Sequence, residues 1–212
     1  MTSVQSFTFN PFQENTYVLF DASKDCVIID PGCSSTAEQE ILLSFIKDNN
    51  LKPVKLLNTH CHIDHILGNK FCADVFKLPL QANKKELRTL DAGMVSAQIF
   101  GIHYDESPLP EIFLDEPDTI VFGESELQVL FTPGHSEGSI CFYNQKDKFL
   151  IGGDVLFFQS IGRTDLPGGN HQQLLSSIKN KLFNLPEEVK VYPGHGPATT
   201  LAYERMHNPF LN

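Results

Sequence analysis

The segment THCHIDH at residues 59–65 follows an apolar, strand-like stretch, VKLL at residues 54–57, after one intervening residue. Alternate side chains share a face in an extended segment, so His60, His62 and Asp64 are expected to point one way. Cys61 and Ile63 then point the other way, which favours a packed thiol for Cys61. Two imidazoles that leave the end of a strand two residues apart are good ligands for zinc or another borderline metal. The segment therefore predicts a metal site at a strand end.

Further candidate ligands share the same setting. Asp64 and His65 are placed for a second ion, where the backbone turns into a short helix over 63–70. His135 in TPGHSEGS, Asp154 in FLIGGD and His195 in VYPGHGP each leave an apolar strand in a glycine-containing turn. A rigid scaffold presents a site in this way, although each residue alone could be an ordinary turn residue. Together with the first motif, five histidines and two aspartates are enough for two ions.

Hydrophobic patterning predicts two stretches of short strands, each followed by helices. The predicted strands are 4–9, 15–20, 26–30, 54–60, 119–122, 126–133, 139–144, 149–154 and 189–195. The predicted helices are 36–49, 63–70, 171–185 and 198–209, the first preceded by a capping box of Ser35 and Glu38. Tight turns between several strands favour mixed sheets. We therefore expect an α/β (α+β) fold with two mixed sheets and helices outside them.

No linker, repeat or low-complexity tract divides the chain, so 1–212 is interpreted as one domain. Residues 84–118 mix a helical pattern with a proline-rich loop and are interpreted as an insertion near the active site.

The net charge of −10 disfavours a nucleic-acid or anionic-membrane partner. The longest apolar run of four residues excludes a membrane-spanning helix. Without a signal-peptide pattern, the five cysteines are expected to be free thiols in the cytoplasm.

At this point the sequence resembles the metallo-β-lactamase superfamily, whose fold is a four-layer αββα sandwich. The motif order, HxHxDH followed by His, Asp and His, runs through residues 60–195. Within the superfamily the chain looks most like the glyoxalase II-type (hydroxyacylglutathione) hydrolases of a short, single-domain kind. The supporting segments are GGDVLF at 152–157, GRTDLPGG at 162–169, YPGHGPATT at 192–200 and NPFL at 208–211.

The resemblance implies a centre of two divalent ions in which Asp64 and Asp154 are the catalytic candidates. One ion would be held by His60, His62 and His135. The other would be held by Asp64, His65 and His195, with Asp154 bridging both. Zinc is the expected metal, with iron and manganese as alternatives. Two divalent ions, two carboxylates and one hydroxide leave a net charge of +1, which suits an anionic transition state.

The implied reaction is hydrolysis of a small-molecule thioester such as S-lactoylglutathione, by attack of a metal-bridging hydroxide. Full-length glyoxalase II enzymes carry a further C-terminal helical domain that helps to hold glutathione. Only 17 residues follow His195 here, so the substrate could be another thioester or ester. Arg163 is the candidate for binding a substrate carboxylate, or else it pairs with Asp165. Asp30 could orient a histidine or simply form the turn with Pro31.

Other functions fit parts of the sequence. A persulfide dioxygenase on the same scaffold would use one iron, with His60, His135 and Asp154 as a facial triad. A β-lactamase is disfavoured because those enzymes act outside the cytoplasm and usually carry cysteine where this chain has Asp154. The acidic charge disfavours a nuclease. A non-catalytic metal-binding module is disfavoured because closed structural zinc sites favour cysteine-rich shells. The sequence leaves the oligomeric state open.

Overall fold

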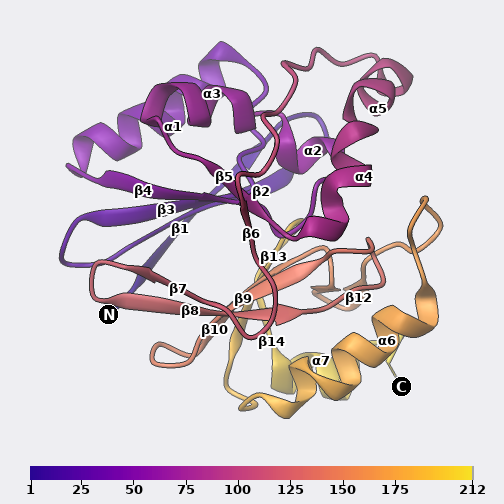
Figure 1. Ribbon diagram of the computed structural model, residues 1–212. Helices are drawn as coiled ribbons and strands as arrows, with labels where there is room; N and C mark the ends of the chain where they lie inside the picture. Colours follow the sequence, from indigo (N-terminus) through magenta and orange to yellow (C-terminus); the bar gives the residue numbers. More distant parts are fainter. Residues whose placement is uncertain (212) are drawn as a thin grey trace. The chain divides into compact units, whose positions relative to one another are not determined.

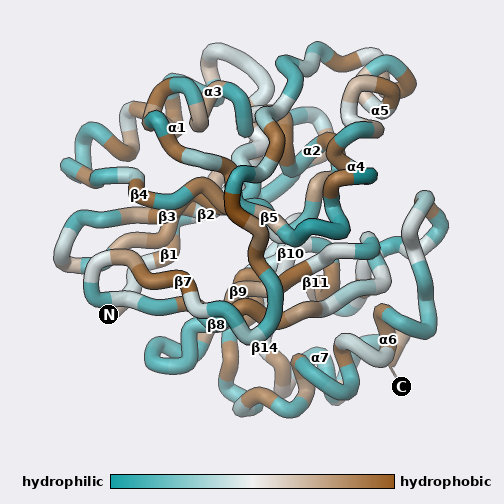
Figure 2. Tube along the Cα trace, viewed as in Figure 1, coloured by the Kyte–Doolittle hydropathy of each residue, from teal (hydrophilic) through white to brown (hydrophobic). Residues whose placement is uncertain are grey.

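The computed structural model describes residues 1–211, and the chain divides into two compact units. The first unit contains residues 1–114 and 121–126, and the second contains residues 115–120 and 127–211. Each unit is built around one six-stranded mixed sheet, and the strands of both sheets are largely apolar (Figures 1 and 2). The expected pair of mixed sheets with helices is therefore present.

The first sheet has the strand order β1-β2-β3-β4-β5-β6. Its strands are β1 (Ser3–Phe9), β2 (Glu14–Phe20), β3 (Asp25–Ile29), β4 (Lys52–Leu57), β5 (Leu80–Ala82) and β6 (Ile112–Phe113). The first three strands form an antiparallel meander, whereas β3, β4, β5 and β6 run parallel to one another. The carboxyl ends of β3, β4 and β5 consequently meet at one edge of this sheet.

The first unit also contains several helices. They are α1 (Thr36–Asp48), α2 (Ile63–Ile66), α3 (Asn69–Phe76), the 3₁₀ turn η1 (Lys84–Glu86), α4 (Leu87–Asp91) and α5 (Gly93–Phe100). Helices α1 and α3 lie on one face of the sheet (Figure 1). Their side chains Leu42, Ile46 and Cys72 are buried in one cluster with strand residues. The predicted capping box of Ser35 and Glu38 begins α1.

The segment 84–118 contributes to the packing of the first unit. Leu90, Ala97 and Tyr104 are buried in a cluster with Ile63 and Ile66 of α2. At the end of the segment, β6 joins the sheet edge beside β5. The segment therefore supports the helix that follows the first histidines of the motif.

The second sheet has the order β14-β13-β10-β9-β8-β7. Its strands are β7 (Thr119–Phe122), β8 (Ser125–Phe131), β9 (Ile140–Asn144), β10 (Phe149–Gly153), β13 (Lys190–Pro193) and β14 (Thr199–Thr200). The turn of the β7–β8 hairpin belongs to the first unit. β8, β9 and β10 are successively antiparallel, and β10 is parallel to β13, so β8, β10 and β13 end at the same edge.

The second unit is completed by a short hairpin and by helices. These elements are β11 (Leu156–Phe157), β12 (Ser160–Ile161), α6 (His171–Asn180), the 3₁₀ turn η2 (Leu182–Asn184) and α7 (Leu201–His207). Leu174 and Ile178 of α6 and Leu201 of α7 are buried against Leu150 and Val191 of the sheet. The amphipathic pattern expected over 171–185 thus buries its apolar face as predicted.

Several strand boundaries differ from the expectation, most of all β4, which was expected over 54–60 and is Lys52–Leu57. Three of the predicted helices also differ. The single short helix predicted over 63–70 is two helices, α2 and α3, separated at Gly68, whose N–H donates to the carbonyl of Pro31. The helix predicted over 171–185 ends at Asn180 and continues as a 3₁₀ turn. The last predicted helix begins only at Leu201, because Thr199 and Thr200 pair with β13 and Thr200 then caps the helix.

All five cysteines are free and buried, in agreement with the expectation of free thiols. Within residues 1–211, no helix combines the length and the apolar character needed to cross a bilayer.

Candidate metal centre

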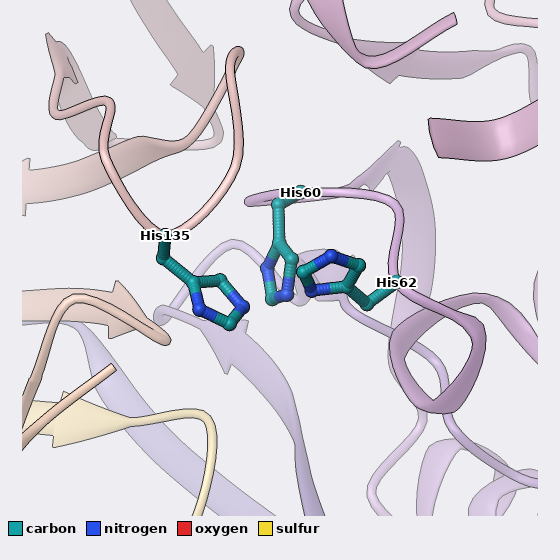
Figure 3. Close-up of side chains that lie close together, drawn as sticks. All are labelled: His60, His62 and His135. Atoms are coloured by element: carbon teal, nitrogen blue, oxygen red, sulfur yellow. The ribbon is translucent and has the colours of Figure 1, made fainter. Parts of the chain in front are cut away.

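The first group of predicted ligands follows β4 in the first unit. β4 ends at Leu57, and the chain bends at Thr59 before His62, which lies at the N-cap of α2. Asp64 and His65 are then carried by that helix. Figure 3 shows the imidazoles of His60 and His62 side by side, with ring centroids 4.9 Å apart. The ring of His65 is 4.1 Å from that of His60. The structure therefore brings three imidazoles of the motif together.

Asp30 lies at the carboxyl end of β3, and its carboxylate accepts three hydrogen bonds and contacts His65. Oδ1 accepts from the Thr59 N–H at 2.7 Å and from Nδ2 of Asn58 at 3.3 Å. Oδ2 accepts from the Thr59 hydroxyl at 2.6 Å and lies 3.1 Å from Nδ1 of His65. Candidate ligand atoms of Asp30, His60 and His65 lie within 4.8 Å of one another. Because its oxygens already accept from the motif, Asp30 orients His65 rather than merely forming a turn.

A second buried acid, Glu14, faces the same network. Its Oε2 accepts from the Thr16 hydroxyl at 2.9 Å, and its Oε1 lies 3.8 Å from Nδ1 of His65. Burial raises the pKa of Glu14 well above its ordinary value, although the nearby His65 opposes that shift. The ring of His65 therefore has acidic groups from β2 and β3 beside its Nδ1.

Cys61 and Ile63 lie on the other side of the motif, as the alternation predicted. Both are buried in the apolar cluster that includes Ile66 and Leu67. Burial raises the pKa of the Cys61 thiol well above its ordinary value. Cys61 is thus a packed thiol, and its environment disfavours the thiolate that a metal would require.

The second group of predicted ligands follows three strands of the second sheet. His135 lies in the loop after β8 and is drawn in Figure 3, Asp154 directly follows β10, and His195 follows β13. The N–H of Gly194 donates to the carbonyl of Gly153 at 2.8 Å, which ties the last two loops together. All three residues therefore reach one edge of the sheet.

Asp154 lies close to both His135 and His195. Its Oδ2 is 3.5 Å from Nε2 of His135 and 3.6 Å from Nε2 of His195. The His135 ring is fixed through Nδ1, which lies 2.8 Å from the carbonyl oxygen of Arg163. His135 is buried, whereas the side chain of His195 is 27% exposed. Within the second unit, the three predicted ligands thus form one group.

Gly134 is what allows the backbone to turn into His135. Its φ is +135°, and a Cβ placed there would lie 2.2 Å from the backbone nitrogen of Leu174 in α6. The carbonyl of Gly134 also accepts the N–H of Asn170 at 2.7 Å, just before α6 begins. A side chain at this position would have to displace the helix, so only glycine fits.

Arg163, the candidate for substrate binding, is paired with Asp165. Its Nε and one terminal nitrogen donate to the two carboxylate oxygens at 2.7 and 2.8 Å. The side-chain hydrogen bonds from Arg163 lower the pKa of Asp165 to about 2. Both side chains are more than half exposed. The structure thus contains the Arg163–Asp165 ion pair, which the sequence offered as the alternative to substrate binding. The pair is exposed at the surface.

The donor set fits a divalent metal. The Nδ1 atoms of His60, His65 and His135 lie 3.1, 3.1 and 2.8 Å from an oxygen of Thr59, Asp30 and Arg163, respectively. A ring fixed through Nδ1 presents Nε2 to a metal, which is the usual arrangement of metal-binding histidines. Imidazole and carboxylate donors together suit zinc, iron and manganese.

Sequence reasoning missed several supporting residues. Thr59, Asn58 and Glu14 surround Asp30 and His65, and Glu86 contacts the backbone of Cys61. Thr59 stands inside the motif and could have been weighed as a partner of His60. Glu14 and Glu86 carry no spacing signal, because the sheet brings them to the motif from distant positions.

A comparison with protein families matches residues 9–195 to the metallo-beta-lactamase superfamily. The chain belongs to this superfamily. It is a metal-dependent hydrolase by class, and the fold class inferred from the sequence is confirmed.

Two curated relatives cover nearly the whole chain. The chain is 39% identical over 204 residues to the probable metallo-hydrolase YqgX of Bacillus subtilis (strain 168). This match covers 95% of this chain and 94% of the relative. It is 33% identical over 216 residues to the hydroxyacylglutathione hydrolase GloC of Haemophilus influenzae, with 99% and 98% covered.

Two solved structures share the fold at similar identity. The BLEG-1 B3 metallo-beta-lactamase superimposes with a TM-score of 0.91 at 40% identity and covers 99% of this chain and 100% of its own. TTHA1623, solved in a di-iron-bound form, has a TM-score of 0.89 at 38% identity, with 98% and 100% covered.

Proposed function

We propose that the chain is a hydrolase of small thioesters that uses two divalent metal ions. In this proposal one ion is held by His60, His62 and His135. The other is held by Asp64, His65 and His195, and Asp154 is shared by both. Zinc is the proposed metal, and the iron in TTHA1623 makes iron the first alternative.

One observation carries the proposal. In each unit the candidate donors follow the carboxyl ends of sheet strands, and histidines in both groups are fixed through Nδ1. Histidines held in this way bind metals with defined geometry. Seven His and Asp donors shared by two ions leave positions open to water, which favours catalysis over a closed structural site.

The bound ions would supply a water of lowered pKa and a Lewis acid for the thioester carbonyl. The chain's own residues orient the donors: Asp30 and Thr59 hold His65 and His60, and the carbonyl of Arg163 holds His135. A thiolate is a weakly basic leaving group, so the chain need not supply a strong general acid. This requirement agrees with thioester hydrolysis.

The substrate class rests on GloC, which is named a hydroxyacylglutathione hydrolase and is similar along the whole chain. The net charge of −10 gives no general attraction for an anionic glutathione conjugate. Binding must therefore be local, and the exposed guanidinium of Arg163 is the proposed contact for a substrate carboxylate.

The test is thiol release from S-lactoylglutathione by metal-loaded protein, followed with a thiol reagent. Asp64→Ala should abolish thiol release. Asp74→Ala is the matched control, because Asp74 lies on the neighbouring helix α3 and forms an exposed ion pair with Lys70. Wild-type protein that carries metal but releases no thiol would contradict the thioester proposal.

A second candidate is β-lactam hydrolysis, because the 40% identical BLEG-1 is named a B3 metallo-beta-lactamase. A chromogenic cephalosporin assayed beside the thioester separates the two. Turnover of the lactam alone would replace the thioester proposal.

One iron per chain, with oxygen uptake on glutathione persulfide, would instead favour the dioxygenase alternative. The cytoplasmic location expected from the sequence stays a prediction.

A further inference from the structure

Glu86 makes a contact with the motif that the proposed ligand set does not include. Its side chain is fully buried, and its Oε2 accepts the backbone N–H of Cys61 at 2.8 Å. Cys61 is the residue between His60 and His62. The carboxylate therefore holds the peptide that joins two proposed ligands.

The topology explains how a residue 25 positions away reaches this peptide. β4 and β5 are parallel neighbours, with Leu56 opposite Leu80 and Leu57 opposite Gln81. The pairing continues one step further, because the Asn58 N–H donates to the Gln81 carbonyl at 3.0 Å. The segments that follow both strands consequently leave the same edge of the sheet, and Glu86 lies on the segment after β5.

The turn that carries Glu86 is itself held in place. Oδ1 of Asn83 accepts the N–H of Lys85 at 3.0 Å, and Nδ2 of Asn83 donates to the carbonyl of Leu114 at 2.8 Å. The N–H of Glu86 donates to the carbonyl of Asn83 at 3.0 Å. Glu86 thus projects from a short, fixed turn rather than from a mobile loop.

The side chain does not serve its own helix. Glu86 lies at the N-cap of α4, yet no side-chain capping bond is made there. Its carboxylate instead accepts the backbone N–H of Cys61. Its direction toward Cys61 indicates that it fixes the metal-binding segment.

We infer that Glu86 is a positioning residue, whose carboxylate sets the separation and direction of His60 and His62 for metal binding. The inference rests on the proposed function, since it concerns the same metal centre. It also assigns a role to residues 83–86, at the start of the segment that the sequence suggested as an insertion. Partners of metal ligands typically affect metal affinity by about 10- to 100-fold.

The test measures Zn²⁺ affinity by competition with a chromophoric chelator. Glu86→Leu removes the acceptor at similar volume and should weaken Zn²⁺ binding by about tenfold or more. Glu86→Gln keeps an acceptor oxygen and should stay within about threefold of wild type. Glu86→Asp keeps the charge, but its shorter side chain withdraws the oxygen from Cys61. Its Zn²⁺ affinity should therefore fall as much as that of Glu86→Leu. This variant replaces Glu86→Leu if that variant fails to fold.

Glu204→Leu is the matched control. Glu204 is equally buried, and its Oε2 likewise accepts a backbone N–H, that of Gln159 at 2.9 Å, but in the second unit. It should retain wild-type Zn²⁺ affinity. The absorption spectrum of Co²⁺-loaded protein, which reports ligand geometry, should change in Glu86→Leu and not in the control.

Wild-type affinity and spectrum in Glu86→Leu or Glu86→Asp would overturn the inference and leave the proposed function standing. An equal loss of Zn²⁺ affinity in Glu86→Gln and Glu86→Leu would overturn it as well. So would an equal loss in Glu204→Leu. A wild-type chain that binds no metal would instead refute the proposed function, and the inference with it.

Discussion

Oδ2 of Asp30 lies 3.1 Å from Nδ1 of His65, and the same carboxylate accepts from both the N–H and the hydroxyl of Thr59. One side chain at the end of β3 therefore fixes the segment that leaves β4. The contact joins two parallel strands at the point where the proposed ligands begin.

Replacing Asp30 with asparagine should weaken metal binding by about 10- to 100-fold. The amide nitrogen of asparagine would face donors that now meet a carboxylate oxygen, so the free energy of unfolding should also fall by about 1–3 kcal/mol. Chelator competition and urea unfolding measure the two effects. Asp21→Asn is the control, because Asp21 is also buried and saturated, but by Ser23, Glu124 and Ser125. Equal metal affinity in both variants would contradict the role of Asp30.

Asp21 should give the protein an acid-dependent component of stability. Although burial opposes the shift, hydrogen bonds from Ser23, Ser125 and the Glu124 N–H lower the pKa of Asp21 from 3.8 to about 2. Because the folded-state pKa is depressed, this stabilisation is present above about pH 4 and is lost as the pH falls toward 2.

Asp21→Asn should therefore lower the free energy of unfolding at pH 7 by about 1–3 kcal/mol, the usual cost of losing hydrogen bonds to a charged group. The difference from wild type should shrink as the pH is lowered from 4 to 2. Urea titrations at pH 7, 4 and 2.5 measure it. A difference that stays constant over this range would show that the Asp21 charge does not stabilise the fold.

Arg163→Ala should raise KM for S-lactoylglutathione by about tenfold, as expected for losing one hydrogen bond to a charged group. The contact to His135 uses the backbone carbonyl of Arg163, so metal content should not change. The unfolding free energy should also be unaffected, because the pair with Asp165 is exposed. Arg205→Ala, on α7, is the control. An unchanged KM would leave Arg163 as a partner of Asp165 only.

The five thiols should resist a thiol reagent in the native protein and react together on unfolding. All five are buried, and burial raises the pKa of Cys61 well above its ordinary value and that of Cys26 to about 12. Labelling with an aromatic disulfide reagent, with and without urea, measures this. Rapid labelling of Cys61 in folded, metal-loaded protein would contradict its packed position.

The sequence predicted the elements whose signal is local. The apolar strands that precede Asp154 and His195 and the capping box before α1 lie where patterning predicts them. The alternation of the motif also predicted the packed position of Cys61, which is buried in the apolar cluster with Ile63 and Ile66.

Features that depend on distant partners were not predictable in this way. β5 has only three residues, and its place in the sheet is set by pairing with β4. Patterning predicts a helix over Thr199 and Thr200, but in the structure they pair with the strand β13. Glu86 carries no spacing signal, and only the parallel pairing of β4 and β5 brings it to Cys61.

The most direct test of the proposed metal centre is the number of ions per chain, measured by elemental analysis on protein made without added metal. Two divalent ions per chain are predicted, and Asp64→Ala should lose one of them together with thioester hydrolysis. One ion per chain in the wild type, with hydrolysis intact in Asp64→Ala, would contradict the proposed two-metal centre.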